Sequence, residues 1–127
     1  MSMDKGRFDQ LAEGLLFMSE TDAPLDYYEL DPEQSRQWPL STGGQFLQLI
    51  GEPATHVEKL APEKFFVDLR QGNEDSEVQV AALQKAMTGE LQNLEGFRVG
   101  EIEIQIFVLG QNDSGNVCGL KTLSVET

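Results

Sequence analysis

The stretch that decides the fold of this chain is EIEIQIFVLG, at residues 101–110. Aliphatic side chains recur there at every second position, namely Ile102, Ile104, Ile106 and Val108. Side chains alternate between the two faces of a β-strand, so this spacing predicts a strand. The intervening Glu101, Glu103, Gln105 and Phe107 predict that its second face is wetter than the first.

The residues after this strand predict a hairpin. The segment Gln111 to Asn116 contains Asp, Ser and Gly together, which is typical of a turn. A last strand is then expected from Val117 towards Val125. Its apolar positions change phase between Leu120 and Leu123, and this change predicts a β-bulge.

Helical spacing dominates the sequence before the hairpin. Ser76 is expected to cap a long helix that continues through Leu91 and Leu94 and ends at Gly96. A shorter helix is expected to start at Pro62, because proline suits the first turn. Another follows Ser41 or Thr42 and stops at Gly51.

The first helix is expected from about Asp4 to Met18, because its apolar residues follow a 3.6-residue period. Short strands are expected at 25–30 and 56–60. Helices mixed with hairpin-connected strands predict one α+β domain, over residues 1–127, with a mostly antiparallel sheet.

The charge of the chain restricts its partners. Nine Lys and Arg stand against 22 Asp and Glu, which gives a net charge of −13 on 127 residues. Such a field repels nucleic acid and anionic membranes and favours encounter with basic partners. Lone Cys118 excludes a disulfide within the chain and favours a reducing cytoplasm.

Catalytic residue types are scarce in this sequence. His56 is the one histidine, and no partner for general base catalysis is visible beside it. Cys118 opens an apolar strand and is interpreted as a small buried hydrophobe. Neither a zinc-ligand spacing nor a phosphate-binding glycine motif occurs, so we expect no cofactor and no metal of the protein's own.

The acidic residues form two groups along the sequence. The first has six carboxylates with no Lys or Arg between Glu20 and Glu33, and the second is Glu74, Asp75 and Glu77. Each alone is expected to be a solvated surface charge, whereas together they suit docking into a cationic groove. The C-terminal Glu126 and Thr127 add oxygens of the kind that divalent cations prefer, although a frayed terminus is the simpler interpretation.

Several motifs resemble the nuclease A inhibitor family. GLLFMSE at residues 14–20 is similar to that family's N-terminal motif, and GNVCGL at 115–120 with SVET at 124–127 is similar to its C-terminal strand. RVGEIEI at 98–104 and FVLG at 107–110 resemble its penultimate strand. The likeness covers nearly the whole chain and is most specific at the two ends.

This resemblance implies an α/β/α sandwich that inhibits a basic, metal-dependent endonuclease acting on both DNA and RNA. It implies that Glu20 pairs with an active-site arginine and that Thr127 reaches the partner's metal. Glu126, next to Thr127, and Asp75 are expected to bind the partner as well. It also implies a protein that is not an enzyme, is a monomer alone and forms a 1:1 complex with the nuclease.

The sequence departs from the family pattern before the long helix. The family has an Asp-Trp pair there, but residues 72–76 contain no Trp, and only Asp75 corresponds to the pair. Aromatic anchors are often the hot spots of an interface, so the target and the affinity stay open. The alternatives are a non-inhibitory module of the same fold that binds another basic protein, and a carboxylate-based hydrolase.

Overall fold

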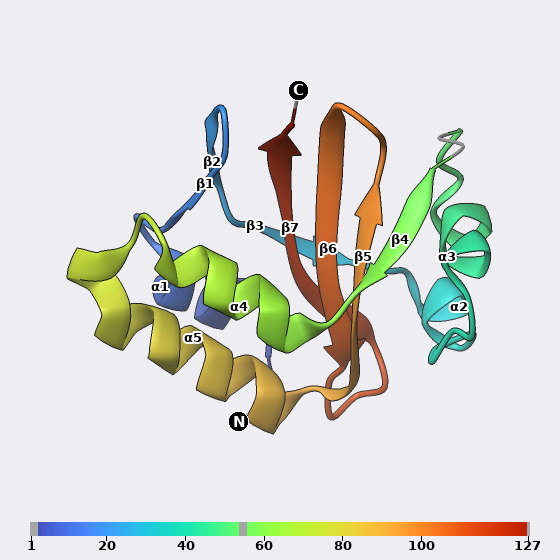
Figure 1. Ribbon diagram of the computed structural model, residues 1–127. Helices are drawn as coiled ribbons and strands as arrows, with labels where there is room; N and C mark the ends of the chain where they lie inside the picture. Colours follow the sequence, from blue (N-terminus) through green and yellow to red (C-terminus); the bar gives the residue numbers. More distant parts are fainter. Residues whose placement is uncertain (1–2, 54–55, 127) are drawn as a thin grey trace.

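A five-stranded antiparallel sheet forms the centre of the molecule in the computed structural model, which describes residues 3–53 and 56–126 (Figure 1). The strand order is β3-β7-β6-β5-β4, and every neighbouring pair is antiparallel. The strands are β3 (Asp26–Glu29), β4 (Val57–Leu60), β5 (Gln92–Val99), β6 (Glu103–Gln111) and β7 (Val117–Val125). The predicted α+β class with a mostly antiparallel sheet is therefore confirmed.

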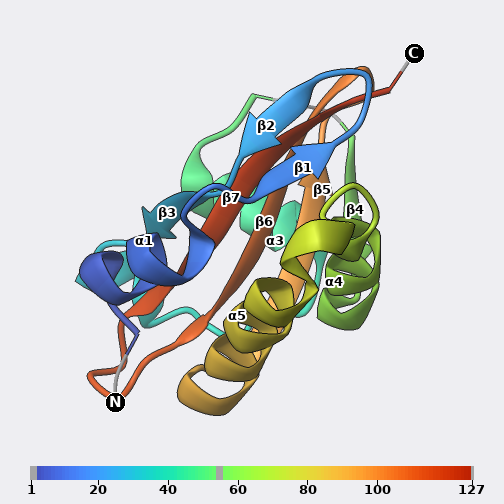
Figure 2. The same ribbon diagram turned by 90° about the vertical axis from the view of Figure 1, so that its left-hand side faces the viewer.

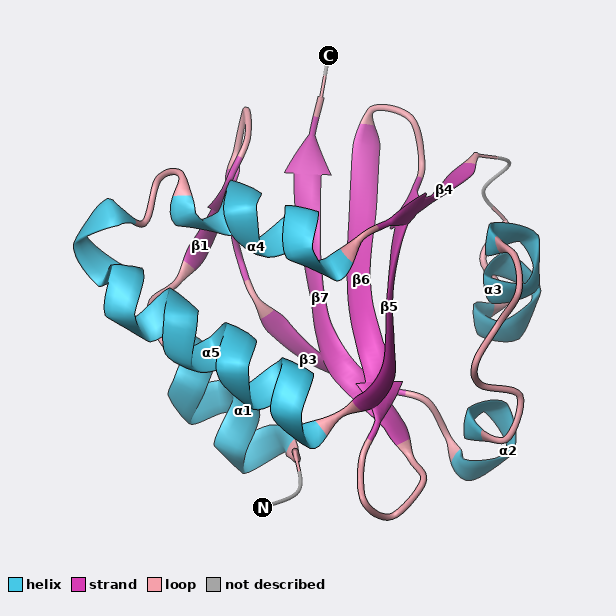
Figure 3. Ribbon diagram, turned by 60° about the horizontal axis from the view of Figure 1, so that its bottom comes forward, coloured by secondary structure: helices cyan, strands magenta, loops and turns pink. Residues whose placement is uncertain are grey.

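Helices cover both faces of this sheet (Figure 3). On one face lie α1 (Lys5–Ala12), α4 (Pro62–Arg70) and α5 (Glu77–Glu90), and on the other lie α2 (Pro32–Ser35) and α3 (Gly43–Ile50). Each face has its own apolar core. The layers therefore form the α/β/α arrangement that the family resemblance implied.

The second face of β6 is drier than predicted. Phe107 and Leu109 are buried there, because α3 places Phe46 against them. The ring of Phe46 stacks on Phe97 with a centroid separation of 4.2 Å. Only the start of β6, around exposed Glu103, has the alternation of a half-solvated strand.

The first helix is shorter than predicted. Asp4 caps α1 as expected, since its carboxylate accepts a hydrogen bond from the Arg7 backbone at 2.9 Å. The chain turns at Gly14, with a φ of 78°, and residues 16–18 form β1 (Leu16–Met18). This strand pairs with β2 (Asp22–Pro24) in a separate hairpin. Phe17 then packs into the core as a strand residue, stacked on Phe65.

The long helix also ends earlier than predicted. It stops at Glu90. Leu91 connects the helix to β5, and β5 itself contains Leu94 and Gly96. Gly96 is needed in the sheet, because a Cβ there would lie 2.3 Å from the Leu60 carbonyl oxygen. Leu91 and Leu94 still contact the core under α5, which explains why their spacing imitated a helix.

The predicted bulge in the last strand is wrong. β7 pairs with β6 in continuous register from Val117 to Val125, and the irregularity lies instead between Gln92 and Glu95 of β5. The apolar phase changes along β7 because Thr122 and Ser124 occupy buried positions, where their hydroxyls donate to the Pro24 carbonyl oxygen and to the Glu126 carboxylate.

The boundaries of α3 and α4 follow their sequence signals, whereas Ser76 precedes α5 without the predicted side-chain capping hydrogen bond. Thr42 caps α3 through a capping box, and Gly51 ends it in the left-handed conformation. α4 begins at Pro62. Within the described residues, no helix is long and apolar enough to cross a membrane.

Candidate functional site

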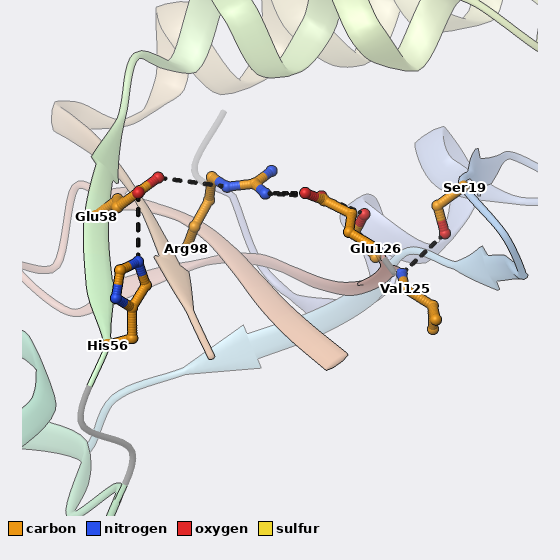
Figure 4. Close-up of polar contacts among 7 residues, drawn as sticks. Ser19, His56, Glu58, Arg98, Val125 and Glu126 are labelled. Carbon is orange, nitrogen blue, oxygen red and sulfur yellow. Dashed lines mark hydrogen bonds and ion pairs between the residues drawn. The ribbon is translucent and has the colours of Figure 1, made fainter. Parts of the chain in front are cut away.

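The turn between β1 and β2 is joined to the C-terminal end of β7. The Glu20 backbone N–H donates to the Val125 carbonyl oxygen at 3.3 Å, and the Val125 N–H donates to the Ser19 hydroxyl at 3.0 Å. Figure 2 shows the hairpin beside the end of β7, and Figure 4 shows the contact of Ser19 with Val125. Two segments that are a hundred residues apart in sequence therefore form one edge of the molecule.

A cleft of about 580 Å³ opens beside this junction, and we call it the Glu20 cleft. Its walls come from β1 and its turn, from α4 and the turn that follows it, and from the ends of β5 and β7. The lining residues are Phe17, Met18, Ser19, Glu20, Asp68, Gln71, Gly72, Arg98, Ser124, Val125 and Glu126. Three carboxylates and one guanidinium thus share the cleft, over a floor that includes buried Phe17.

Glu126 is part of an internal ion-pair network. Arg98 Nη2 donates to both of its carboxylate oxygens, at 2.7 and 2.6 Å, and the Ser124 hydroxyl donates at 2.8 Å. The hydrogen bonds from Arg98 hold the pKa of Glu126 below its ordinary value. Arg98 Nε also lies 3.9 Å from Glu58, which contacts His56 at 3.3 Å (Figure 4).

The other two carboxylates of the cleft differ in their surroundings. Asp68 accepts a hydrogen bond from Lys64 one helical turn earlier, at 2.6 Å. Glu20 lies at the tip of the β1–β2 hairpin, exposed to solvent. The Glu20 side chain is therefore exposed beside the cleft, on a backbone that is hydrogen-bonded to β7.

Asp75 lies outside the Glu20 cleft. It is exposed on the single-turn 3-10 helix η1 (Glu74–Ser76) and lines a neighbouring depression with Glu77 and Val78. The Glu74 carboxylate accepts the Gly72 backbone N–H at 2.9 Å, and this bond lowers the pKa of Glu74. The acidic turn therefore flanks the cleft wall without entering it.

Asn73 fastens this turn to the hairpin. Its side-chain amide donates to the Leu16 and Leu69 carbonyl oxygens, each at 2.7 Å, and the side chain is buried. Sequence reasoning missed Asn73, as it missed Ser19 and Arg98. Arg98 carried one usable signal, because it is a basic residue inside a motif shared with the family.

Thr127 lies outside the described residues, so its predicted role remains a prediction. The first acidic group does not form one surface: Glu20 belongs to the hairpin, Glu29 to β3, and Asp31 caps α2 on the opposite side of the sheet. The sequence could not reveal this division, since it depends on the path of the chain between the layers.

The two residues considered for catalysis, His56 and Cys118, have different surroundings. His56 is exposed beside β4, whereas Cys118 is buried at the start of β7, where burial raises the pKa of its thiol. In the described ranges no group of three or more His, Cys, Asp and Glu side chains is placed to hold a metal ion.

Comparisons with known proteins place this architecture in a family. No curated protein matches the chain. The family model described as nuclease A inhibitor-like protein matches residues 5–127. Because that match extends over nearly the whole sequence, the chain belongs to the nuclease A inhibitor-like protein family.

Proposed function

We propose that this protein inhibits a metal-dependent endonuclease that cleaves DNA and RNA without sequence specificity, by forming a 1:1 complex in the cytoplasm. Membership of the nuclease A inhibitor-like family supports this function, and so does the net charge of −13. The protein acts by occlusion and performs no chemistry of its own.

One observation carries the proposal: Glu20 and the end of β7 form a single edge through two hydrogen bonds. A nuclease site that binds phosphodiesters presents cations to its substrate, so carboxylates at that edge are complementary to it. The Glu20 backbone is hydrogen-bonded to β7, and a preorganised surface loses little conformational entropy when it binds. The edge can therefore stand in for the phosphates of a substrate.

The proposed roles follow from position. Glu20 pairs with a cationic side chain of the nuclease, and Thr127, as the family resemblance implies, reaches its metal. Asp75 adds negative charge from the flanking turn. Removing one partner of a desolvated charge pair typically costs about 2–5 kcal/mol of binding free energy, so Glu20 should dominate.

The first test titrates the protein against a non-specific metal nuclease from the same cell and follows plasmid degradation. Wild type is expected to slow degradation, and Glu20→Gln is expected to weaken inhibition at least about thirtyfold. Glu33→Gln is the matched control, because it removes the same charge from α2, on the other side of the sheet. Undiminished degradation at micromolar excess of wild type contradicts the proposal.

The second test concerns the C-terminus. Several residues added after Thr127 should obstruct the approach to the metal and weaken inhibition strongly. The same residues added before Met1 are the control for the added length. Equal inhibition by both extended proteins removes Thr127 from the mechanism while leaving Glu20 in place.

The missing aromatic anchor favours one alternative, a non-inhibitory module that binds another basic protein. Residues 71–76 contain no aromatic residue, and the depression beside Asp75 has Val78 as its large apolar side chain. Capture from the native lysate separates the two functions, because inhibition requires a nuclease among the bound proteins.

A further inference from the structure

The polar groups of Glu126 are hydrogen-bonded within the protein, at its surface. Its backbone N–H donates to the Ile102 carbonyl oxygen at 2.8 Å, beyond the last residue of β7. Its carboxylate accepts hydrogen bonds from Arg98 and Ser124, at 2.6–2.8 Å. Both the main chain and the side chain of this residue are therefore held by neighbouring elements.

Arg98 is itself held from the opposite side. It stands on β5 directly across from Glu58 of β4, and its Nε lies 3.9 Å from that carboxylate. Its side chain is only 23% exposed, compared with 46% for Glu126. The Arg98 guanidinium lies between two carboxylates and is mostly covered, so it offers Glu126 a positioned point of attachment.

We propose that Arg98 is a positioning residue that clamps Glu126, together with Ser124, and so fixes the direction in which the chain leaves β7. This inference rests on the proposed function and deepens it. Glu126 serves the inhibitor through the clamp, and the contacts with the nuclease are left to Glu20 and the residue after the clamp. Because Glu126 is already held in the free protein, the complex does not pay the entropy cost of fixing this residue on binding.

The first measurement uses the free protein, so it does not depend on any nuclease. Hydrogen exchange of the Glu126 amide, followed by NMR, should accelerate roughly fivefold in Arg98→Gln, the effect expected from a part-exposed ion pair. Lys59→Gln is the matched control, because it also removes one positive charge from a β4–β5 ion pair, that of Lys59 with Glu95 at 3.1 Å. Unchanged exchange at Glu126 in Arg98→Gln overturns the clamp.

A second variant keeps the test decisive if Arg98→Gln does not fold. Ser124→Ala removes one hydrogen bond from the Glu126 carboxylate and leaves Arg98 in place. It should accelerate exchange of the Glu126 amide about twofold, and normal exchange there counts against the clamp. Arg98→Lys keeps the charge and should restore part of the protection that Arg98→Gln loses.

Binding to the nuclease then separates positioning from direct contact. If Glu126 acts through Arg98, then Arg98→Gln, Glu126→Gln and the double variant should lose affinity to the same extent, about fivefold, without additivity. If Glu126 touches the nuclease instead, Arg98→Gln should leave binding intact or tighten it while Glu126→Gln weakens it, and this outcome overturns the proposal. If the Glu126 amide is protected from exchange by Arg98 but wild type does not inhibit the nuclease, the clamp stands and only the proposed function has failed.

Discussion

Gly72 makes a close contact at the wall of the Glu20 cleft. Its φ is +91°, and a Cβ at this position would lie 2.2 Å from Cγ of Met18. We predict that Gly72→Ala lowers the free energy of unfolding by about 2–3 kcal/mol, because the strained backbone and the displaced Met18 both contribute. Urea unfolding measures the stability, and nuclease titration should show weaker inhibition because Met18 lines the cleft.

Gly115→Ala is the control for this effect. Gly115 also has a positive φ, of +83°, but no atom lies within 4 Å of the added Cβ. It should lose about 1 kcal/mol through backbone strain and keep full inhibition. Equal losses in the two variants would show that the contact with Met18 contributes nothing.

Glu90 links stability to pH through its ion pair with Arg7. The Arg7 guanidinium donates through Nε to both carboxylate oxygens, at 2.7 and 2.9 Å, and these hydrogen bonds lower the pKa of Glu90. A lowered folded-state pKa contributes stability above the ordinary value of 4.5, and that contribution disappears as the pH falls through the folded pKa.

We therefore expect the melting temperature of wild type to be higher than that of Glu90→Gln at pH 7. The two melting temperatures should converge as the pH falls below 4.5. Thermal unfolding followed by circular dichroism measures both. Glu101→Gln, which removes an exposed carboxylate from the turn before β6, is the matched control. A difference that persists unchanged at the acidic end would contradict the assignment to this ion pair.

At the scale of elements, α3 depends on Thr42, the residue that caps its N-terminus. The Thr42 hydroxyl accepts the Gln45 backbone N–H at 3.2 Å, and this helix supplies Phe46 to the second core. Thr42→Ala should cost about 1 kcal/mol of unfolding free energy, as expected for a lost N-cap. Urea unfolding should show no comparable loss in Ser41→Ala, since Ser41 contacts Gln45 through its backbone.

The elements also show what the sequence could predict. Local signals were sufficient where a cap or a glycine acts on its own neighbours, as at Asp4, Thr42 and Gly51. They were insufficient for β5, because the spacing of Leu91 and Leu94 is helical and would place them on opposite faces of a regular strand. Both contact the same core because the register of β5 shifts between Gln92 and Glu95. The pairing of Gly96 with Leu60 decides between helix and strand, and that contact is long-range.

The candidate site shows the same difference between local signals and long-range contacts. The family resemblance predicted Glu20 and the C-terminal residues, because those positions carry specific motifs. It marked Arg98 only as a basic residue within a family motif and gave no signal for Asn73, since each acts by reaching a segment distant in sequence. Asn73 bonds to Leu16, and Arg98 bonds to Glu126.

At the scale of the whole molecule, charge should control how fast the complex forms. With a net charge of −13, association with a basic nuclease should slow about tenfold or more between 50 mM and 500 mM salt, because screening removes the steering field. Dissociation should change much less. Stopped-flow measurement of both rates checks this, and a salt-independent association rate would exclude electrostatic steering.

The two ends of β7 lie near different parts of the molecule, and this determines how the protein should be immobilised. Met3 contacts Cys118 and Asn112 at the start of this strand, whereas Val125 and Glu126 border the Glu20 cleft at its finish. A biotin or fusion partner attached ahead of Met3 would therefore anchor the protein to a sensor chip by its rear. The inhibitory edge would then face the flowing solution, so immobilisation from that side should preserve capture of the nuclease.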